Sequence, residues 1–268
     1  MDYNLINGGI PPQIGNLTNL SGLSLSNKIS GAIPPSLSHL KSLVDLNLGQ
    51  NFLTMELPTD IGNLSNIASL LLNNNNLSGE IPPSFQKLEQ LEQLDLENNL
   101  FAGEIPTWLV NFKNLSDLNL GANKLVLKNA RIAPRCILDV LSLRSCNLSG
   151  QIPIWISNQT KLLSLDLSDN NLEGTLPQCL FGEIPYTLVY LFELSYLDLS
   201  NNKLEGRIPC GPQMDTMNDP NSYANNNGLC GMQIKVSCEM VPSKPKLKRE
   251  RPRKKELGDM VFTGNGSD

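Results

Sequence analysis

Aromatic and histidine residues are scarce in this chain. Aromatic side chains make up 5% of its 268 residues, and His39 is the only histidine. One histidine on a segment expected to be solvated gives little support to a catalytic triad, and no nucleophile elbow accompanies it. The sequence also contains no Walker loop, no HRD or DFG kinase element and no CxxC pair. We therefore expect a protein that is not an enzyme and that holds no metal or cofactor.

Long apolar runs and an N-terminal targeting segment are also missing. No apolar run reaches the roughly 18–20 residues that a membrane-spanning helix needs. The start, Met1-Asp2-Tyr3-Asn4, carries an acid where a signal peptide has its basic region, and no apolar segment follows it. We therefore expect neither a secretion signal nor a membrane anchor within this chain.

Positive charge is scarce except near the C-terminus. Of the 21 basic residues, eight lie between Lys244 and Lys255, where Glu250 is the only acid. The rest of the chain holds 13 basic and 25 acidic residues, about −12 in net charge, whereas the whole chain carries −5. Low apolar content and charge of one sign predict a disordered basic tail over residues 244–268.

A leucine pattern, LxxLxLxxNxLxGxIP, repeats along most of the chain. Its central leucines recur every 23 or 24 residues, apart from a final interval of 32. They are Leu23, Leu46, Leu70, Leu94, Leu118, Leu141, Leu165 and Leu197. Along LxL, alternate side chains face opposite sides of a short strand, so the leucines point inward and their neighbours face solvent. Stacked coils bury leucines that one coil cannot bury alone, and the repeated Asn can stack into a ladder that satisfies buried backbone groups.

The GxIP elements carry a resemblance to a known family. They read Gly79-Glu-Ile-Pro82, Gly103-Glu-Ile-Pro106 and Gly150-Gln-Ile-Pro153, and the pattern extends from residue 4 to about residue 243. This resembles the plant-specific class of leucine-rich repeats, in which the xxLxLxx strands line a ligand-binding concave face. The prediction is an α/β repeat: a leucine-rich-repeat solenoid, curved as a right-handed superhelix, with short parallel strands on its concave face.

Several stretches depart from the pattern. The coil centred on Leu118 lacks GxIP, and Cys146 takes the place of the ladder Asn in the next coil. Gly182-Glu-Ile-Pro185 begins only eight residues after Gly174 opens a similar element. We therefore expect disorder or a bulge near residues 179–190. The chain also opens within a coil and lacks the family's cysteine-paired N-terminal cap.

The segment after the last coil resembles the cap that closes plant receptor-like proteins and receptor-like kinases. We expect repeats over residues 1–209, a C-terminal cap over 210–243 and the basic tail over 244–268. In this cap, Cys230 and Cys238 are eight residues apart, and a disulfide bond between them would hold the cap as a lid over the last coil. Three other cysteines are expected to be small buried hydrophobic side chains: Cys136, Cys146 and Cys179. Cys210 has no assigned role.

Eleven side chains are expected to face solvent on the concave strands, opposite the leucines. They are Asp45, Asn47, Glu92, Asp95, Glu97, Asp117, Asn119, Asp139, Arg144, Asp166 and Asp198. Stacked carboxylates repel one another weakly, so we expect a basic partner whose association weakens as salt rises. Glu92, Asp95 and Glu97 are the strongest candidates because three acids share one strand. The alternative is a solvated polar face, and nothing in the sequence sets the pKa values of Asp95 and Glu97 apart as a glycosidase would need.

Asn-x-Ser/Thr sequons recur along the repeats. They begin at Asn16, Asn19, Asn63, Asn76, Asn114, Asn147, Asn158 and Asn265. In a secreted repeat protein they are candidate glycan acceptors, and most are expected on turns or on the convex side, away from the strand face. The alternative is that Asn-Leu-Ser and Asn-Leu-Thr are simply what this repeat's consensus spells.

The favoured interpretation is an extracellular binding module that resembles a truncated plant receptor-like protein and senses a peptide or protein ligand. In that family, such ectodomains lie on the outer face of the plasma membrane and signal in defence or development through a co-receptor kinase. Membrane attachment would require a segment missing from this chain. No nucleic-acid partner is expected, because sequons and a cap disulfide belong outside the cell.

Three alternatives stay open. The chain could be an ectodomain fragment of a leucine-rich-repeat receptor kinase, a secreted inhibitor of pathogen wall-degrading enzymes similar to polygalacturonase-inhibiting proteins, or a non-functional gene fragment. Genomic sequence would separate these interpretations. A membrane-spanning stretch just downstream supports the receptor-like protein, and a kinase reading frame supports the receptor kinase. A stop after the cap, with a signal peptide upstream, supports the secreted inhibitor. The basic tail could itself be an artefact, since Glu codons read one base out of frame can become Lys and Arg codons.

Overall fold

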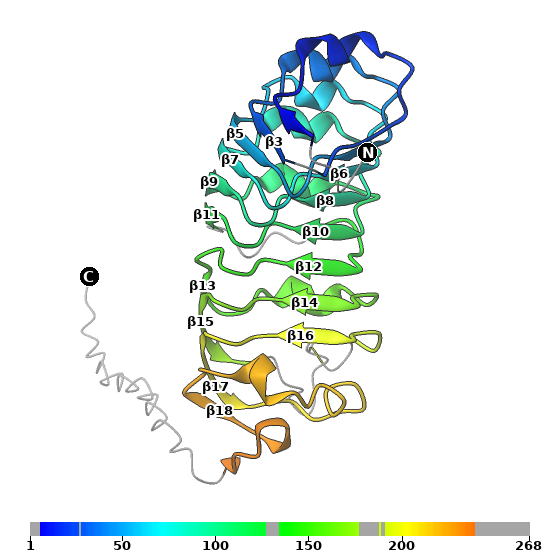
Figure 1. Ribbon diagram of the computed structural model, residues 1–268. Coiled ribbons are helices and arrows are strands. Elements are labelled where there is room, and N and C mark those ends of the chain that lie inside the picture. Colours follow the sequence, from blue (N-terminus) through cyan, green and yellow to red (C-terminus); the bar gives the residue numbers. More distant parts are fainter. Residues whose placement is uncertain (1–5, 27, 127–133, 177–187, 189–190, 239–268) are drawn as a thin grey trace, which may run out of the picture.

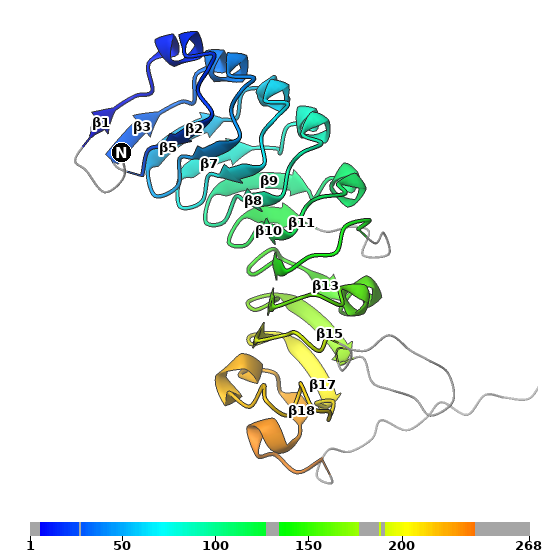
Figure 2. The ribbon, with the colours of Figure 1, turned by 90° about the vertical axis from the view of Figure 1, so that its right-hand side faces the viewer.

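The computed structural model describes residues 6–26, 28–126, 134–176, 188 and 191–238. Within these residues, successive coils stack in single file, and Figure 2 shows them fanned along an arc with their short helices on its outer edge. The basic tail at 244–268 lies outside the described residues. So do Cys179 and the rest of the stretch 179–190, where disorder or a bulge was expected, except for Leu188. No helix among the described residues is long and apolar enough to cross a membrane.

One parallel sheet of eight strands runs the length of the solenoid (Figure 1). Each neighbouring pair aligns its central leucines in register, from Leu23 beside Leu46 to Leu165 beside Leu197. The strands are β2 (Gly22–Ser24), β4 (Asp45–Asn47), β6 (Ser69–Leu71), β8 (Gln93–Asp95), β10 (Asp117–Asn119), β12 (Val140–Ser142), β14 (Ser164–Asp166) and β16 (Tyr196–Asp198). The solenoid and the strand positions predicted from the leucines are therefore confirmed.

A second set of strands follows the ladder Asn of each coil, where the sequence interpretation placed only a turn. Six form one parallel sheet: β1 (Asn7–Gly8), β3 (Lys28–Gly31), β5 (Phe52–Glu56), β7 (Asn76–Gly79), β9 (Leu100–Glu104) and β11 (Lys124–Val126). Four form another: β13 (Ser149–Gly150), β15 (Asn171–Thr175), β17 (Lys203–Arg207) and β18 (Gly228–Cys230). The two sheets part after β11, in the coil that lacks GxIP. The pattern glycines take a positive φ, such as 81° at Gly79, and Met55 takes a φ of 71° at the same position within β5. Residues 127–133, which follow β11, lie outside the described residues.

The outer edge of the arc consists of 3-10 helices. They are η1 (Pro12–Asn16), η2 (Pro35–His39), η3 (Ile61–Asn63), η4 (Pro83–Lys87), η5 (Thr107–Asn111) and η6 (Ile154–Asn158). Three of them begin with the second proline of Ile-Pro-Pro, whose fixed φ suits a helix start and whose missing N–H has no helical partner to lose. His39 ends η2 with an exposed side chain, as expected.

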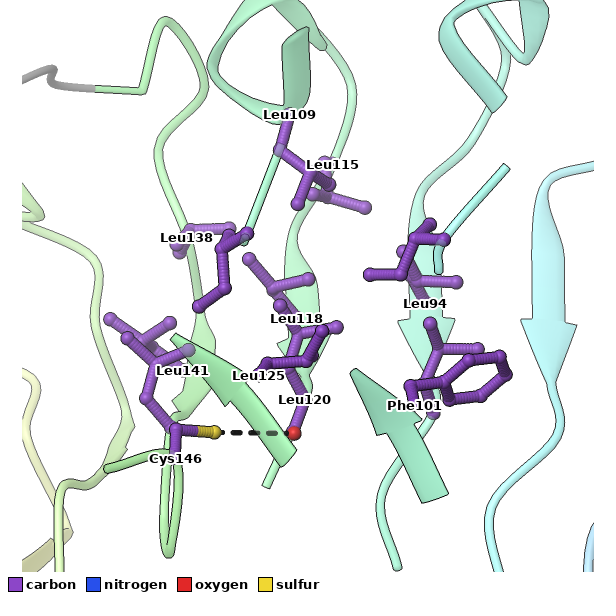
Figure 3. Packing of buried hydrophobic residues seen from close by; sticks show 14 of the residues in the cluster. Leu94, Phe101, Leu109, Leu115, Leu118, Leu120, Leu125, Leu138, Leu141 and Cys146 are labelled. Atoms are coloured by element: carbon purple, nitrogen blue, oxygen red, sulfur yellow. Dashed lines mark hydrogen bonds between the residues drawn. The ribbon is translucent and has the colours of Figure 1, made fainter. Parts of the chain in front are cut away.

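The core is a continuous stack of leucine and isoleucine side chains between the two strand sets and the helices. Figure 3 shows Leu94, Leu118 and Leu141 of successive strands in one layer of this stack. Leu94 is 1% exposed and Leu141 is 0% exposed. Burying one such side chain contributes roughly 1.5–3 kcal/mol, so the leucine stack is the main source of stability.

The predicted Asn ladder joins each coil to its neighbours. Asn99 donates to the carbonyl of Leu72 in the preceding coil at 2.9 Å and to Leu96 and Glu97 in its own coil at 3.1 and 3.2 Å. Its carbonyl oxygen accepts from the backbone N–H of Leu77 at 3.0 Å. The same donations recur at Asn51, Asn75, Asn123, Asn170, Asn202 and Asn226.

Cys146 occupies the ladder position of its coil, as the sequence indicated. Its thiol is fully buried and donates to the Leu120 carbonyl at 3.4 Å, the contact drawn in Figure 3. Burial raises its pKa to about 12, so this thiol is not a reactive nucleophile. Cys136 is buried as expected, and Cys210 is exposed.

The predicted cap disulfide is present. Cys230 and Cys238 are bonded, with their Cα atoms 5.0 Å apart. The repeat geometry extends past Cys210, because β18 pairs with β17 and Asn226 donates to Leu199 as a ladder residue. Two short 3-10 helices, η8 (Pro220–Tyr223) and η9 (Met232–Ile234), complete the described part of the lid. Tyr223, the last residue of η8, is buried and donates its hydroxyl hydrogen to the Met217 carbonyl at 3.0 Å.

Candidate ligand-binding face

The eight-stranded sheet places solvent-facing side chains in two columns, one on each side of the central leucines. The column after the leucines runs Ser24, Asn47, Leu71, Asp95, Asn119, Ser142, Asp166 and Asp198. Asp45 and Asp117 lie in the column before the leucines, and Glu92 and Asp139 come just before their strands. Glu97 and Arg144 follow two residues after their strands. The structure therefore places seven of the eleven sequence-predicted residues on the strands of one sheet and the other four within two residues of a strand end.

The carboxylates on this face are less closely stacked than the sequence suggested. In the column after the leucines, Leu71 and Asn119 flank Asp95. Asp166 and Asp198 are the one pair of acids in directly neighbouring strands within the two columns. Repulsion between adjacent acids is therefore concentrated near the C-terminal end of the sheet.

Five of the predicted binding residues also have a structural role that the sequence interpretation missed. Each accepts a hydrogen bond from the backbone N–H two residues further on. The distances are 3.0 Å for Asn47, 3.0 Å for Asp95, 3.2 Å for Asn119, 2.9 Å for Asp166 and 2.9 Å for Asp198. This is an Asx turn, which ends the strand and starts the bend toward the ladder Asn. The recurrence of Asp or Asn at this position was the signal for it.

Arg144 lies among acids at the start of the C-terminal half. Its Nε donates to Asp169 at 2.9 Å, and both side chains are partly exposed. This hydrogen bond raises the pKa of Arg144, and the negative charges of Asp166 and Glu97 act in the same direction. Glu97 in turn accepts from the Asn119 amide at 3.1 Å. Asp169, which sequence reasoning did not select, belongs to this cluster because it lies in the next coil beside Arg144.

Burial changes the acid–base behaviour of several groups on this face. Loss of hydration raises the pKa of Asp95 to about 6, and the nearby charge of Glu97 adds to that rise. Burial also raises the pKa of Asp166, with the Asp198 carboxylate adding to the rise. Asp95 is thus not the ordinary solvated acid that the sequence suggested, because packing beside Leu71 removes water from it.

Replacing Asp95 with asparagine is expected to stabilise the protein near neutral pH. The folded-state pKa of about 6 lies above the ordinary aspartate value of 3.8, so ionised Asp95 costs stability above pH 6. Asparagine can keep the Asx turn, as Asn47 and Asn119 do. After discounting for partial exposure, the gain should be about 1–2 kcal/mol at pH 8 and should vanish as the pH falls through 6 toward 4.

Urea unfolding at pH 8 and pH 4 measures this effect. Asp45→Asn is the matched control on the exposed part of the face and should change stability by less than about 0.5 kcal/mol at either pH. Equal stability of D95N and the parent chain at pH 8 would show that Asp95 carries no penalty.

The sequons lie away from the eight-stranded sheet. Asn16, Asn63 and Asn158 end helices η1, η3 and η6, and Asn76 begins β7. Asn19, Asn114 and Asn147 lie in connecting segments, and all seven of these side chains are exposed. Asn265 lies outside the described residues. Glycans at the seven positions would leave the concave strands uncovered.

Comparison with known families agrees with this geometry. The Leucine Rich Repeat family model matches residues 42–64, 66–88, 90–112, 138–159, 161–182 and 193–213, together half of the chain. The chain belongs to the leucine-rich-repeat family. Receptor-like protein 46 from Arabidopsis thaliana is 44% identical over 56 residues, which cover 21% of this leucine-rich-repeat chain and 7% of that protein.

Solved structures of plant leucine-rich-repeat ectodomains are similar over most of this chain. The PEPR1–AtPEP1 complex matches with a TM-score of 0.76 and 32% identity, covering 86% of this chain and 32% of that one. The Arabidopsis receptor kinase HAESA, in complex with the peptide hormone IDA and the co-receptor SERK1, matches with a TM-score of 0.71 and 31% identity. This match covers 90% of this chain and 38% of that one. A plant ice-binding protein matches with a TM-score of 0.66 and 29% identity, covering 89% of this chain and 84% of that one. This chain thus resembles a plant receptor-like ectodomain and spans about a third of the receptor chains.

Proposed function

We propose that this chain is a ligand-binding part of an extracellular plant receptor-like ectodomain. Its eight-stranded sheet would recognise a peptide or protein ligand, and signalling would pass through a co-receptor kinase at the plasma membrane. The observation that carries the proposal is the uninterrupted eight-stranded face, along which polar side chains project and no sequon lies. The similar HAESA structure, which holds a peptide hormone and the co-receptor SERK1, supports this choice.

The charge of the face favours a basic ligand. Glu92 is exposed and Glu97 is half-buried, and neither carboxylate is committed to an Asx turn, although Glu97 accepts from the Asn119 amide at 3.1 Å. Asp95, between them in sequence, is committed to the turn and partly desolvated. A concave surface dominated by one sign of charge attracts an oppositely charged partner and speeds encounter with it.

Charge reversal of Glu92 and Glu97 tests the proposal. The probe is an array of synthetic 12-residue peptides of differing net charge. The parent chain should select basic peptides, and Glu92→Lys/Glu97→Lys should weaken their binding by about ten-fold or more. Affinity should also fall as salt is raised, because screening shortens the range of exposed charges.

A matched control separates a specific face from general charge attraction. Glu80→Lys/Glu173→Lys makes the same change in net charge at exposed positions outside the eight-stranded sheet. It should leave the selected peptides bound with unchanged affinity. An equal loss in both variants, or basic peptides held as tightly by Glu92→Lys/Glu97→Lys as by the parent chain, would reject the concave acids as the site.

A further inference from the structure

A groove of about 470 Å³ opens between η4 and η5 on the outer side of the solenoid, away from the eight-stranded sheet. The η4 side supplies Gln86, Glu89 and Gln90, and the η5 side supplies Trp108, Phe112 and Asn114. Its volume lies within the roughly 300–1,000 Å³ that ligand sites occupy. The proposed ligand face does not use this groove.

A change in the repeat explains why the groove opens here. Trp108 stands where the corresponding positions of η2 and η4 carry Ser36 and Ser84. Its ring packs 6.1 Å from Phe85 of η4 and 5.8 Å from Phe112, measured between ring centroids. The large side chain therefore acts as a spacer between two neighbouring coils.

The backbone at the end of η5 changes as well. Phe112 has ψ 139°, whereas Leu40, Leu64 and Leu88 end their helices with ψ of 63–64°. The backbone hydrogen bond that closes η5, from Phe112 N–H to the Leu109 carbonyl, stretches to 3.5 Å, compared with 2.8 Å from Leu88 to Phe85 in η4. The chain thus leaves η5 in an extended direction, while Asn114 keeps the contact with the preceding coil that Asn66 makes with the Lys41 carbonyl at 3.0 Å.

The lining of the groove suits an amphipathic occupant. Trp108 provides apolar ring surface, with the buried Phe112 behind it, and Gln86, Gln90 and Asn111 provide amide donors and acceptors. A sugar ring has a matching form, with an apolar face of C–H groups and an edge of hydroxyl groups. The groove therefore has the chemistry of a saccharide site.

Asn114 connects this chemistry to a covalent source of sugar. It opens the sequon Asn114-Leu115-Ser116, its side chain is exposed, and it lines the groove. Its Nδ2 donates to the Glu89 carbonyl at 3.3 Å across the groove. N-glycosylation bonds Nδ2 to the anomeric carbon of the first sugar as the bond from that carbon to a lipid diphosphate breaks; the lipid diphosphate leaves and Nδ2 loses one proton. The remaining N–H can keep the bond to Glu89 and direct the glycan along the groove.

We propose that the groove between η4 and η5 seats the N-linked glycan of Asn114, with its first sugars packed against Trp108. This inference rests on the proposed extracellular function, because the glycan is added only in the secretory pathway. The glycan would cover the ring of Trp108, which is partly exposed, whereas Phe85 and Phe112 are already buried. Among the described sequons, Asn114 is placed in a groove with a tryptophan.

Quenching of tryptophan fluorescence by acrylamide tests the proposal on the full chain, secreted from a glycosylating host behind an added signal. Trp155 is 7% exposed, so quenching of fluorescence reports mainly on Trp108. Asn114→Gln removes the glycan, and so does Ser116→Ala, which leaves Asn114 unchanged. Either substitution should raise the acrylamide quenching constant by about two-fold or more, because the Trp108 surface that the glycan covers becomes exposed. Asn63→Gln, which removes a sequon on η3, should leave it unchanged.

Mass spectrometry of glycopeptides separates the ways in which the proposal could fail. Equal quenching with and without an occupied Asn114 would overturn the glycan seat alone and leave the proposed function standing. An empty Asn114 beside occupied Asn63 and Asn158 would do the same. If none of the sequons carries a glycan in a secreted protein, the extracellular function proposed above loses its support together with this inference.

Discussion

Replacing Asn99 with alanine is expected to lower the free energy of unfolding by about 3–5 kcal/mol, because several buried backbone groups lose their partner at once. The Asn99 amide donates to the carbonyls of Leu72, Leu96 and Glu97, and its oxygen accepts from Leu77 N–H. Asn99 is only 6% exposed, so water cannot readily replace these bonds. Two of the lost bonds join neighbouring coils, so the loss weakens their interface as well as one turn. Urea unfolding followed by circular dichroism measures the change.

The neighbouring Asn98 provides the control for this substitution. It is exposed, and its side chain donates to the Asn74 oxygen at 2.7 Å on the surface. Alanine already stands at the equivalent position of the next coil, where Ala122 has a φ of 50° close to the 54° of Asn98. Asn98→Ala should therefore cost less than about 1 kcal/mol. Similar losses for the two variants would mean that the ladder is not the principal polar contact between coils.

Replacing Leu94 with alanine is expected to cost about 3 kcal/mol, within the range of 2–5 for deleting a buried leucine side chain. Leu94 is 1% exposed, and its strand is paired on both sides, with Leu70 and Leu118 in register. The substitution would leave a cavity at a junction between coils, and the parallel strands on either side limit how far the core can collapse into it. In a solenoid this weakens two interfaces between repeats, so unfolding should begin at lower urea.

Leu100 is the matched control, because it is the same residue type six positions later but is 41% exposed at the start of β9. Leu100→Ala should change the free energy of unfolding by less than about 1 kcal/mol. A cost at Leu94 no larger than the cost at Leu100 would contradict the view that the register of the central leucines supplies most of the stability.

The candidate face illustrates which features of a site a repeat sequence can predict. The period and the alternation along LxL were enough to put Asp45, Asp117 and Asp166 on one face, since both depend only on positions along the chain. They were not enough to show that Asp95 loses water beside Leu71, or that Arg144 pairs with Asp169 of the next coil. Both effects depend on which side chains become neighbours when coils stack.

The groove at Trp108 shows the same limit on the outer side. The sequon at Asn114 can be read from three residues, but its place beside Trp108 at the edge of a groove depends on how neighbouring coils stack. Nothing in the local pattern shows that Phe112 leaves the helix with an extended ψ.

The sequence by itself determined the solenoid, the position of every strand in the eight-stranded sheet, the Asn ladder and the Cys230–Cys238 bond. It could do so because the same residue types recur at the same positions of each coil, and a coil can bury its leucines only against another coil. The tertiary structure alone decided where the second set of strands breaks after β11, which acids stand side by side and where the groove at Trp108 opens. These features depend on differences in sequence between adjacent coils. Such differences affect the structure only through contacts between residues about 24 positions apart, which form when the coils stack.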